Sequence, residues 1–341
     1  MLVLKNDVIK NLFSNLDIPG VQDYQNTLLD ALREYKTDPS IIPPRIVKST
    51  EFGCTHLFMA STGSTVGMKA ITGSKEGFKG ITTVLDKKTG YPLGVINGAT
   101  LTAFRTALCN TLPLVKVFPL DANYESETLV VFGVGDQAIW HIKLAMILYP
   151  NRFTRVVISN RTVSKAEQLC NELQLEHKST KFEAVGLPSG KSDDPLLEIF
   201  KTTSVVFTCI PTSQPTITTK LVQQLKKQCF IGAIGSYKPH MTEIEGDVLR
   251  KYILEKGGKI VVDSTEHCLH EAGEFIINEI NEDSLVEISS LYENGNKNEW
   301  IKNQTIVVSK LVGLCIMDVS VGNLCLEKAK NSGNALDILD F

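Results

Sequence analysis

The chain has 341 residues and a mass of 37.6 kDa, a length typical of two domains. Hydrophobic residues make up 43% and charged residues 21% of it, which excludes a disordered chain. The net charge is −3, and its cations are spread along the sequence, whereas nucleic-acid binding depends on clustered cations. No apolar run approaches the roughly 20 residues that a membrane span needs. We therefore expect a soluble protein that binds neither nucleic acid nor membrane.

The eight cysteines include no C-x-x-C pair, and several lie in apolar runs. This pattern is typical of buried thiols in a reducing compartment, and it predicts a cytoplasmic protein without a disulfide framework. His267 and His270 share a segment, but no third cluster of ligands accompanies them, so we expect no metal site.

The first third of the chain mixes helical and extended patterns. Apolar residues at helical spacing predict helices over residues 7–16, 22–35 and 100–116. Short apolar runs broken by glycine predict strands of an antiparallel or mixed sheet at 55–60, 67–72, 80–86 and 93–97. The turn residues 87–90 indicate a hairpin between the last two.

From residue 128 onward, runs rich in β-branched residues alternate with helix-length segments. They predict strands at 128–132, 155–159, 182–185, 204–210, 229–234 and 259–263. Six such strands fit a doubly wound parallel sheet. Residues 307–329 are apolar with helical spacing, so we expect them to leave this unit as a helix and to pack on the first domain, which would then be discontinuous.

A glycine turn follows the first of these strands. The run Leu129-Val-Val-Phe enters Gly133-x-Gly135-x-x-Ala138, and the residues after it predict a helix over 137–149. The first glycine permits a tight turn, the second leaves room for a pyrophosphate, and the helix N-terminus offers free N–H groups to it. The turn predicts a dinucleotide site; the alternative is a glycine turn that binds nothing.

The tip of the next strand bears on the choice between NAD and NADP. It reads Ser159-Asn160-Arg161-Thr162 and lacks the acid that usually holds the ribose 2′-OH of NAD. A guanidinium binds a 2′-phosphate well, and Asn160 and Thr162 add neutral donors. We therefore predict NADP(H) in preference to NAD(H); the alternative is that Arg161 is a solvated surface residue.

Three cations of the first domain lie in unusual contexts. Arg45 follows a double proline, Lys69 lies between Met68 and Ala70, and Arg105 lies inside an apolar helix. A cation among apolar residues is unfavourable unless it is paired or faces a ligand. The three therefore indicate an anion site, with buried ion pairs or snorkelling side chains as the alternative.

At these residues the chain resembles the ornithine cyclodeaminase/μ-crystallin family over nearly its whole length. The helix at 98–107 followed by the glycine turn is the most specific part. The matching segments are 44–45, 67–69, 98–107, 133–138, 159–162, 235–243, 262–264, 271–273 and 310–313 with Asp318.

The resemblance implies an α/β protein with a Rossmann-type doubly wound parallel sheet and a discontinuous α+β substrate/dimerisation domain. We expect the latter at residues 1–122, completed by 309–341, and the NAD(P)-binding domain at 123–308. It also implies a homodimer with the active site between the domains. By motif position, Arg45 and Arg105 would hold a substrate carboxylate, and Lys69 would contact the reacting end of the substrate. Because the two neighbouring arginines lower its pKa, we expect that Lys69 could also donate the proton that a reducible imine needs.

The candidate site residues follow from these motifs. The catalytic candidates are Lys69, Arg45 and Arg105. The cofactor-binding candidates are Arg105, Thr106, Gly133, Val134, Gly135, Asp136, Gln137, Asn160, Arg161, Thr162, Cys209 and Ile234.

The sequence departs from the family at two positions. Where cyclodeaminases carry an Asp that handles the substrate amino groups, this chain has Tyr237, which is not an anion at neutral pH. Glu243 or Glu245 could take over that role. Leu311 stands where the closing K-S-x-G element has serine.

The resemblance leaves three functions open. The first is an NAD(P)H-dependent oxidoreductase that acts at the α-carbon of imino and amino acids, like the ketimine reductases of the family. The second is an ornithine cyclodeaminase-type lyase that forms proline and ammonia. The third is a non-catalytic NADPH-dependent ligand-binding protein like μ-crystallin. Loss of the Asp favours the reductase, because reduction of an imine needs no such base.

Overall fold

The structure is a computed structural model that describes all residues except 75–76, 237, 294, 296–297 and 340–341. The chain divides into two compact units. Unit 1 comprises residues 1–109 and 313–341, and unit 2 comprises residues 110–312. Within the described residues, no helix combines the length and the apolar composition that crossing a membrane requires.

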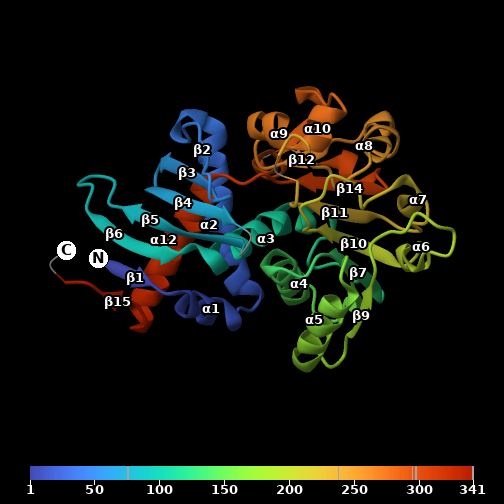
Figure 1. The fold of residues 1–341 in the computed structure, drawn as a ribbon, viewed down its shortest axis with the longest axis horizontal. Helices are drawn as coiled ribbons and strands as arrows, with labels where there is room; N and C mark the ends of the chain where they lie inside the picture. The colour runs from blue at the N-terminus through green and yellow to red at the C-terminus, as the bar shows by residue number, and fades with distance from the viewer. Residues whose placement is uncertain (75–76, 237, 294, 296–297, 340–341) are drawn as a thin grey trace. The chain divides into compact units, whose positions relative to one another are not determined.

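Unit 1 is an α+β unit built on a mixed sheet of order β15-β1-β6-β5-β4-β3-β2 (Figure 1). Its strands pair antiparallel, except that β1 runs parallel to β6. The elements are β1 (Leu2–Leu4), α1 (Asn6–Ser14), α2 (Ile18–Thr37), β2 (Ile46–Ser49), β3 (Thr55–Thr62), β4 (Val66–Ser74), β5 (Gly77–Leu85), β6 (Pro92–Asn97), residues 98–109 of α3 (Gly98–Val117), α12 (Cys315–Ser332) and β15 (Leu336–Asp337).

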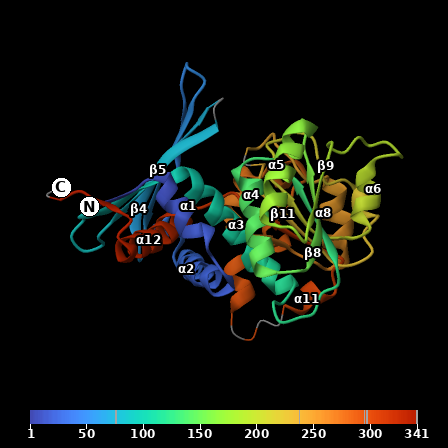
Figure 2. The ribbon, with the colours of Figure 1, turned by 90° about the horizontal axis from the view of Figure 1, so that it is seen from below.

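Helix α2 shows why these segments fold as they do. Asp17 caps its start by accepting a hydrogen bond from the Gly20 amide at 2.8 Å, and the buried residues of the helix recur at helical spacing. Helices α2 and α12 pack against each other (Figure 2). Phe104 of α3 stacks on Phe13 of α1 and meets Tyr24 of α2 edge to face, which joins three helices in one aromatic core.

Unit 2 is a doubly wound α/β unit with an all-parallel sheet of order β13-β12-β14-β11-β10-β7-β8-β9. The elements are β7 (Glu127–Phe132), α4 (Asp136–Leu148), β8 (Phe153–Ser159), α5 (Val163–Glu176), β9 (Lys181–Val185), α6 (Pro195–Phe200), β10 (Thr203–Thr208), α7 (Thr219–Val222), β11 (Cys229–Ala233), α8 (Gly246–Tyr252), β12 (Ile260–Val262), α9 (Thr265–Glu271), α10 (Gly273–Ile277), β13 (Leu285–Glu287), α11 (Glu299–Lys302) and β14 (Ile306–Lys310).

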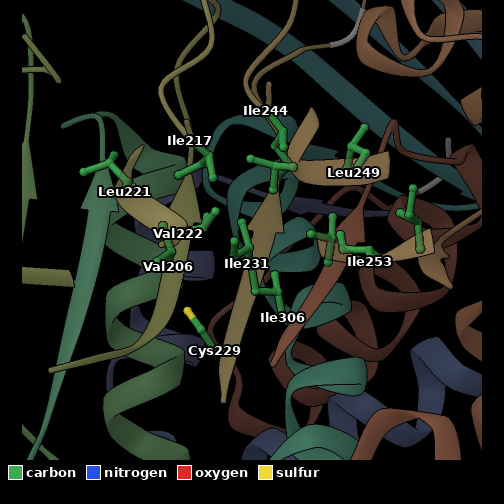
Figure 3. Close-up of a cluster of buried hydrophobic side chains, with 14 of the residues drawn as sticks. Val206, Ile217, Leu221, Val222, Cys229, Ile231, Ile244, Leu249, Ile253 and Ile306 are labelled. Carbon is green, nitrogen blue, oxygen red and sulfur yellow. The ribbon is translucent and has the colours of Figure 1, made fainter. Parts of the chain in front are cut away.

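The core of unit 2 lies against this sheet. Figure 3 shows part of it, where Val206, Ile231 and Ile306 from neighbouring strands meet residues of the covering segments such as Ile244 and Leu249. All five are at most 1% exposed. Burial of each such side chain stabilises the fold by about 1.5–3 kcal/mol, so the sheet is a rigid support for the loops at its edges.

The predicted fold class is confirmed, and all six predicted strands of the parallel sheet form. The prediction of one helical stretch over residues 307–329 is wrong at its start. Residues 306–310 form β14, a central strand between β11 and β12 (Figure 1). Helix α12 begins only at Cys315, after Gly313, whose φ of +87° ends the extended run. Strand β13 was not predicted either.

Candidate functional site

The predicted cations of unit 1 include two that share a buried counter-ion. Lys69 of β4 donates a 2.7 Å hydrogen bond to Oδ1 of Asp318 in α12. Nε of Arg105, in α3, lies 3.2 Å from Oδ2 of the same carboxylate. Lys69, Arg105 and Asp318 are 2%, 5% and 0% exposed. We call these three residues the Lys69 cluster.

Burial sets the electrostatics of Lys69. Burial removes water from the ammonium and has the largest effect on its pKa, which is lowered to about 8. The nearby charge of Arg105 also lowers this pKa, whereas the attraction of Asp318 raises it. The expectation that the two arginines lower this pKa is therefore only partly right, because burial dominates and Arg45 is not among the causes. An ammonium with a pKa near 8 is a better proton donor than an ordinary lysine.

Lys69 keeps one donor for a ligand. Its ammonium carries three hydrogens, of which one is donated to Asp318 and another to the Thr102 hydroxyl at 2.9 Å. Among the described residues, no partner takes the third. The position is suited to a ligand atom that accepts a proton.

Arg105 is a buried guanidinium that the protein satisfies poorly. Its Nη1 donates to the sulfur of Met317 at 3.4 Å, and its Nε meets Asp318 without hydrogen-bond geometry. A thioether is a weak acceptor, so within the described residues the guanidinium is poorly satisfied and can bind another anion. The arrangement fits a carboxylate, which a guanidinium binds in a bidentate manner.

Gly313 brings Arg45 to the same place. Nη2 of Arg45 donates to the Gly313 carbonyl at 3.0 Å. A Cβ on Gly313 would lie 2.9 Å from both Nη1 and Nη2 of Arg105. The two arginines thus flank one glycine. Thr106, the next candidate along α3, is 4% exposed and donates its hydroxyl hydrogen to the Thr102 carbonyl within the helix.

The glycine turn of unit 2 has the predicted geometry. Gly133 follows β7 with φ of +114°, and a Cβ there would lie 3.0 Å from Ile210. Gly135 is the N-cap of α4 and has open space where a Cβ would point. Half-buried Val134 lies between them, exposed Asp136 begins α4, and the Gln137 carbonyl accepts from His141.

The remaining candidates of unit 2 lie at the carboxyl ends of adjacent strands. Exposed Arg161 and Thr162 follow β8, and Asn160 donates a 2.9 Å hydrogen bond to the Thr162 carbonyl. Cys209 follows β10 and Ile234 follows β11. In open parallel sheets, ligands bind at this edge, so the candidates share the expected side of the sheet.

A second buried cluster explains other parts of the family pattern. Lys310, at the end of β14, donates to Ser236 at 2.7 Å and to Glu243 at 3.2 Å, and lies 3.4 Å from Glu274. Lys310, Glu243 and Glu274 are all fully buried. Burial raises the pKa of Glu243, although Lys310 opposes the shift. The cluster joins the end of β14 to the segment after β11 and to α10.

This cluster also corrects the expectation that Glu243 or Glu245 could stand in for the missing Asp. Glu243 is committed to Lys310, Ser236 and Thr208. Glu245 accepts hydrogen bonds from the amide and hydroxyl of Thr219. Tyr237 lies outside the described residues.

Sequence reasoning gave no role to Asp318 or Thr102, and it did not predict the ion pairs of Lys310 with Glu243 and Glu274. Like the cations, Asp318 is a single charge in an apolar segment, with Cys315, Ile316, Met317 and Val319 around it. A buried lysine needs a buried acid as its partner, so considering Lys69 and Asp318 together would have indicated their ion pair.

The comparisons with known proteins agree with this architecture. The model of the ornithine cyclodeaminase/mu-crystallin family matches residues 20–333, so the chain belongs to that family. A Δ1-pyrroline-2-carboxylate reductase of Bacillus cereus is 27% identical, over 89% of this chain and 90% of its own.

Two solved structures are similar over nearly their whole length. The Δ1-pyrroline-2-carboxylate reductase of Thermococcus litoralis in complex with NADH and L-proline has a TM-score of 0.79 at 20% identity, covering 99% of this chain and 100% of its own. An archaeal alanine dehydrogenase dimer with bound NAD has a TM-score of 0.78 at 19% identity, covering 100% and 99%. At these identities the likeness shows the fold.

Proposed function

We propose that this protein is an NAD(P)H-dependent reductase of α-imino acids, with small cyclic ketimines such as Δ1-pyrroline-2-carboxylate as substrates. The family membership and the names of the relatives support this reaction class. In the proposal, unit 1 binds the substrate and unit 2 binds the nicotinamide cofactor.

The observation that carries the proposal is the poorly satisfied guanidinium of Arg105 beside the proton donor Lys69. Arg105, with Arg45 across Gly313, binds the substrate carboxylate. Because the carboxylate of an α-imino acid is attached to the reacting carbon, its anchoring also fixes that carbon and the imine nitrogen.

Lys69 supplies the proton in this proposal. Its third ammonium hydrogen passes to the imine nitrogen, and the C=N double bond becomes a C–N single bond when the carbon receives a hydride. Lys69 then regains a proton from water. The buried position of Lys69, 2% exposed, keeps competing water away from the transfer.

The residues of unit 2 fit the cofactor. The Gly133 turn, the open space at Gly135 and the first N–H groups of α4 form a cradle for a pyrophosphate. When bound, NAD(P)H supplies the hydride that reduces the imine carbon. Val134, Asp136, Gln137, Cys209 and Ile234 would line its site, and the roles of Arg105 and Thr106 toward it are part of the same proposal.

We propose further that NADP(H) is preferred. Among the described residues, exposed Arg161 has no ion-pair or hydrogen-bond partner, which leaves its guanidinium available for a 2′-phosphate. Arg161→Ala should weaken NADPH binding about tenfold or more, because a charge-assisted hydrogen bond contributes about 1.5–3 kcal/mol. NADH affinity, measured by the same fluorescence titration, should stay the same. Equal affinities of the wild-type protein for the two cofactors would contradict the preference.

Lys69→Met should abolish imine reduction, because no other donor replaces the ammonium, while NADPH still binds. The assay follows NADPH absorbance with a panel of cyclic and acyclic imino acids. Exposed Lys48 of β2 provides the matched control, since Lys48→Met removes a cation from the same unit and should retain the rate. A Lys69→Met variant of unchanged rate would remove Lys69 from the mechanism.

The same assay separates the alternatives. A cyclodeaminase releases ammonia from ornithine with no net consumption of cofactor. A non-catalytic binding protein shows NADPH affinity that depends on a carboxylate ligand and no turnover with any imine of the panel. Either result, without NADPH consumption, would overturn the reductase.

A further inference from the structure

Asp318 lies where three elements of unit 1 converge. It comes from the first turn of α12, Lys69 comes from β4, and Arg105 comes from α3. Its two carboxylate oxygens are divided between them, with Oδ1 at 2.7 Å from the Lys69 ammonium and Oδ2 at 3.2 Å from Nε of Arg105. The carboxylate is fully buried, so no water weakens either attraction.

Among the described residues, three titratable groups act on the Lys69 ammonium most strongly. Asp318 and Arg105 are charged, and Cys315 is the third. Burial raises the pKa of Cys315 to about 12, so this thiol stays neutral. The Thr102 hydroxyl accepts a hydrogen bond from Lys69 but carries no charge. Asp318 is therefore the group that favours the charged form of Lys69.

We propose that Asp318 is a positioning residue that fixes the Lys69 ammonium and the Arg105 guanidinium relative to each other. The carboxylate of Asp318 then stabilises the charged form of Lys69, the proton donor. It also orients the guanidinium of Arg105, which binds the substrate carboxylate. The inference deepens the proposed reductase and rests on it only where turnover is measured.

The charge state of Lys69 determines how kcat/KM should depend on pH. Lys69 donates a proton only while it is charged, so kcat/KM of the wild-type protein should fall as the pH rises through about 8. In Asp318→Asn the favourable charge is gone, whereas burial and Arg105 still lower the pKa of Lys69. The alkaline limb should therefore move to lower pH, and KM should rise because Arg105 loses its anchor.

The test observes Lys69 directly. The protein is labelled with [ε-¹³C]lysine, and the Lys69 resonance is assigned as the one missing from Lys69→Met. We expect it to titrate near pH 8 in the wild-type protein and at least one pH unit lower in Asp318→Asn. The imine assay, run in parallel, should show the shifted alkaline limb and a KM raised at least tenfold.

Glu127→Gln is the matched control. Glu127 is a buried carboxylate of unit 2 between Arg152 and Lys227, so its loss also breaks a buried ion pair. It should lower stability and leave the Lys69 titration in place. An unchanged Lys69 midpoint in Asp318→Asn overturns the inference even if the enzyme is active. A shifted midpoint without turnover of any imine supports the inference and overturns the proposed reductase.

If Asp318→Asn does not fold, Thr102→Val provides a second test of the role given to Asp318. It removes the other acceptor of Lys69 but no charge, so the Lys69 midpoint should move by less than half a pH unit. A shift of one unit or more would show that the hydroxyl governs the protonation of Lys69, and it would overturn the role given to Asp318.

Discussion

Gly313 lies between the two arginines that we propose to bind the substrate carboxylate. Its φ of +87° is unfavourable for any residue with a Cβ, and that Cβ would lie 2.9 Å from the Arg105 guanidinium. Gly313→Ala should lower the free energy of unfolding by about 1–2 kcal/mol. It should also displace the flexible end of Arg105 and raise KM for the imine at least tenfold, which steady-state kinetics would measure.

Gly333 separates the two effects of that substitution. Its φ is +68°, yet nothing lies within 4 Å of a Cβ built on it. Gly333→Ala should therefore lower stability by a similar amount and leave KM in place. If both variants raise KM equally, backbone strain rather than contact with Arg105 is responsible.

Single residues show what the sequence could reveal about the site. Lys69 and Arg105 were found because a cation among apolar neighbours is unfavourable without a partner, and both are indeed buried. Their partner was not assigned, because Asp318 is about 250 positions from Lys69 and only the fold brings them together. The positions of charged residues along the sequence do not show which of them form ion pairs in the folded protein.

The elements show a similar division between local and non-local information. The apolar run that forms β14 predicts the start of a helix when it is considered alone, because a short apolar run is compatible with either structure. Its place between β11 and β12 satisfies backbone groups of three strands at once, and this long-range pairing decides its conformation. The strands β7 to β12 were predicted because glycine turns and helix-length segments separate them clearly.

The junction of β7 and α4 allows cofactor binding to be separated from folding. Gly135 has φ of −85° and ψ of 179°, which any residue adopts at a helix N-cap. In Gly135→Ser the hydroxyl would cap the first turn of α4 and occupy the open space left for a phosphate. We expect the free energy of unfolding to stay the same or rise by a few tenths of a kcal/mol, while the Kd of NADPH rises at least tenfold.

Gly133→Ala is the contrasting variant at the same junction. Its φ of +114° and its contact distances of 3.0 Å to Ile210 and 3.2 Å to the Cys209 carbonyl leave no room for a Cβ. This variant should lose both stability and NADPH affinity in thermal unfolding and titration. Unchanged NADPH affinity in a well-folded Gly135→Ser would show that the turn does not bind the phosphates.

At the scale of the whole molecule, the sheet of unit 1 carries a row of exposed apolar side chains on one face. Ile46, Phe58, Ala70 and Ile81 are in register across β2, β3, β4 and β5, so their side chains share a face. The neighbouring row of Met59, Lys69 and Thr82 points to the opposite face, where Lys69 meets Asp318 of α12. Ile46, Phe58 and Ile81 remain 64%, 44% and 44% exposed. A contiguous exposed apolar row of this kind is typical of an interaction surface.

We propose that a second copy of the chain covers this row in a homodimer, since a flat apolar face is complementary to itself about a two-fold axis. Ile81→Lys would place a charge at the β5 end of the row and bring two such charges into the interface. Light scattering during gel filtration should give twice the 37.6 kDa chain mass for the wild-type protein and the single chain mass for the variant.

Leu175→Lys is the control, because it introduces a lysine at an 80% exposed leucine of α5, and it should remain a dimer. Equal masses for the wild-type protein and Ile81→Lys would exclude this face as the dimer interface, because a buried lysine pair without counter-ions destabilises association by several kcal/mol.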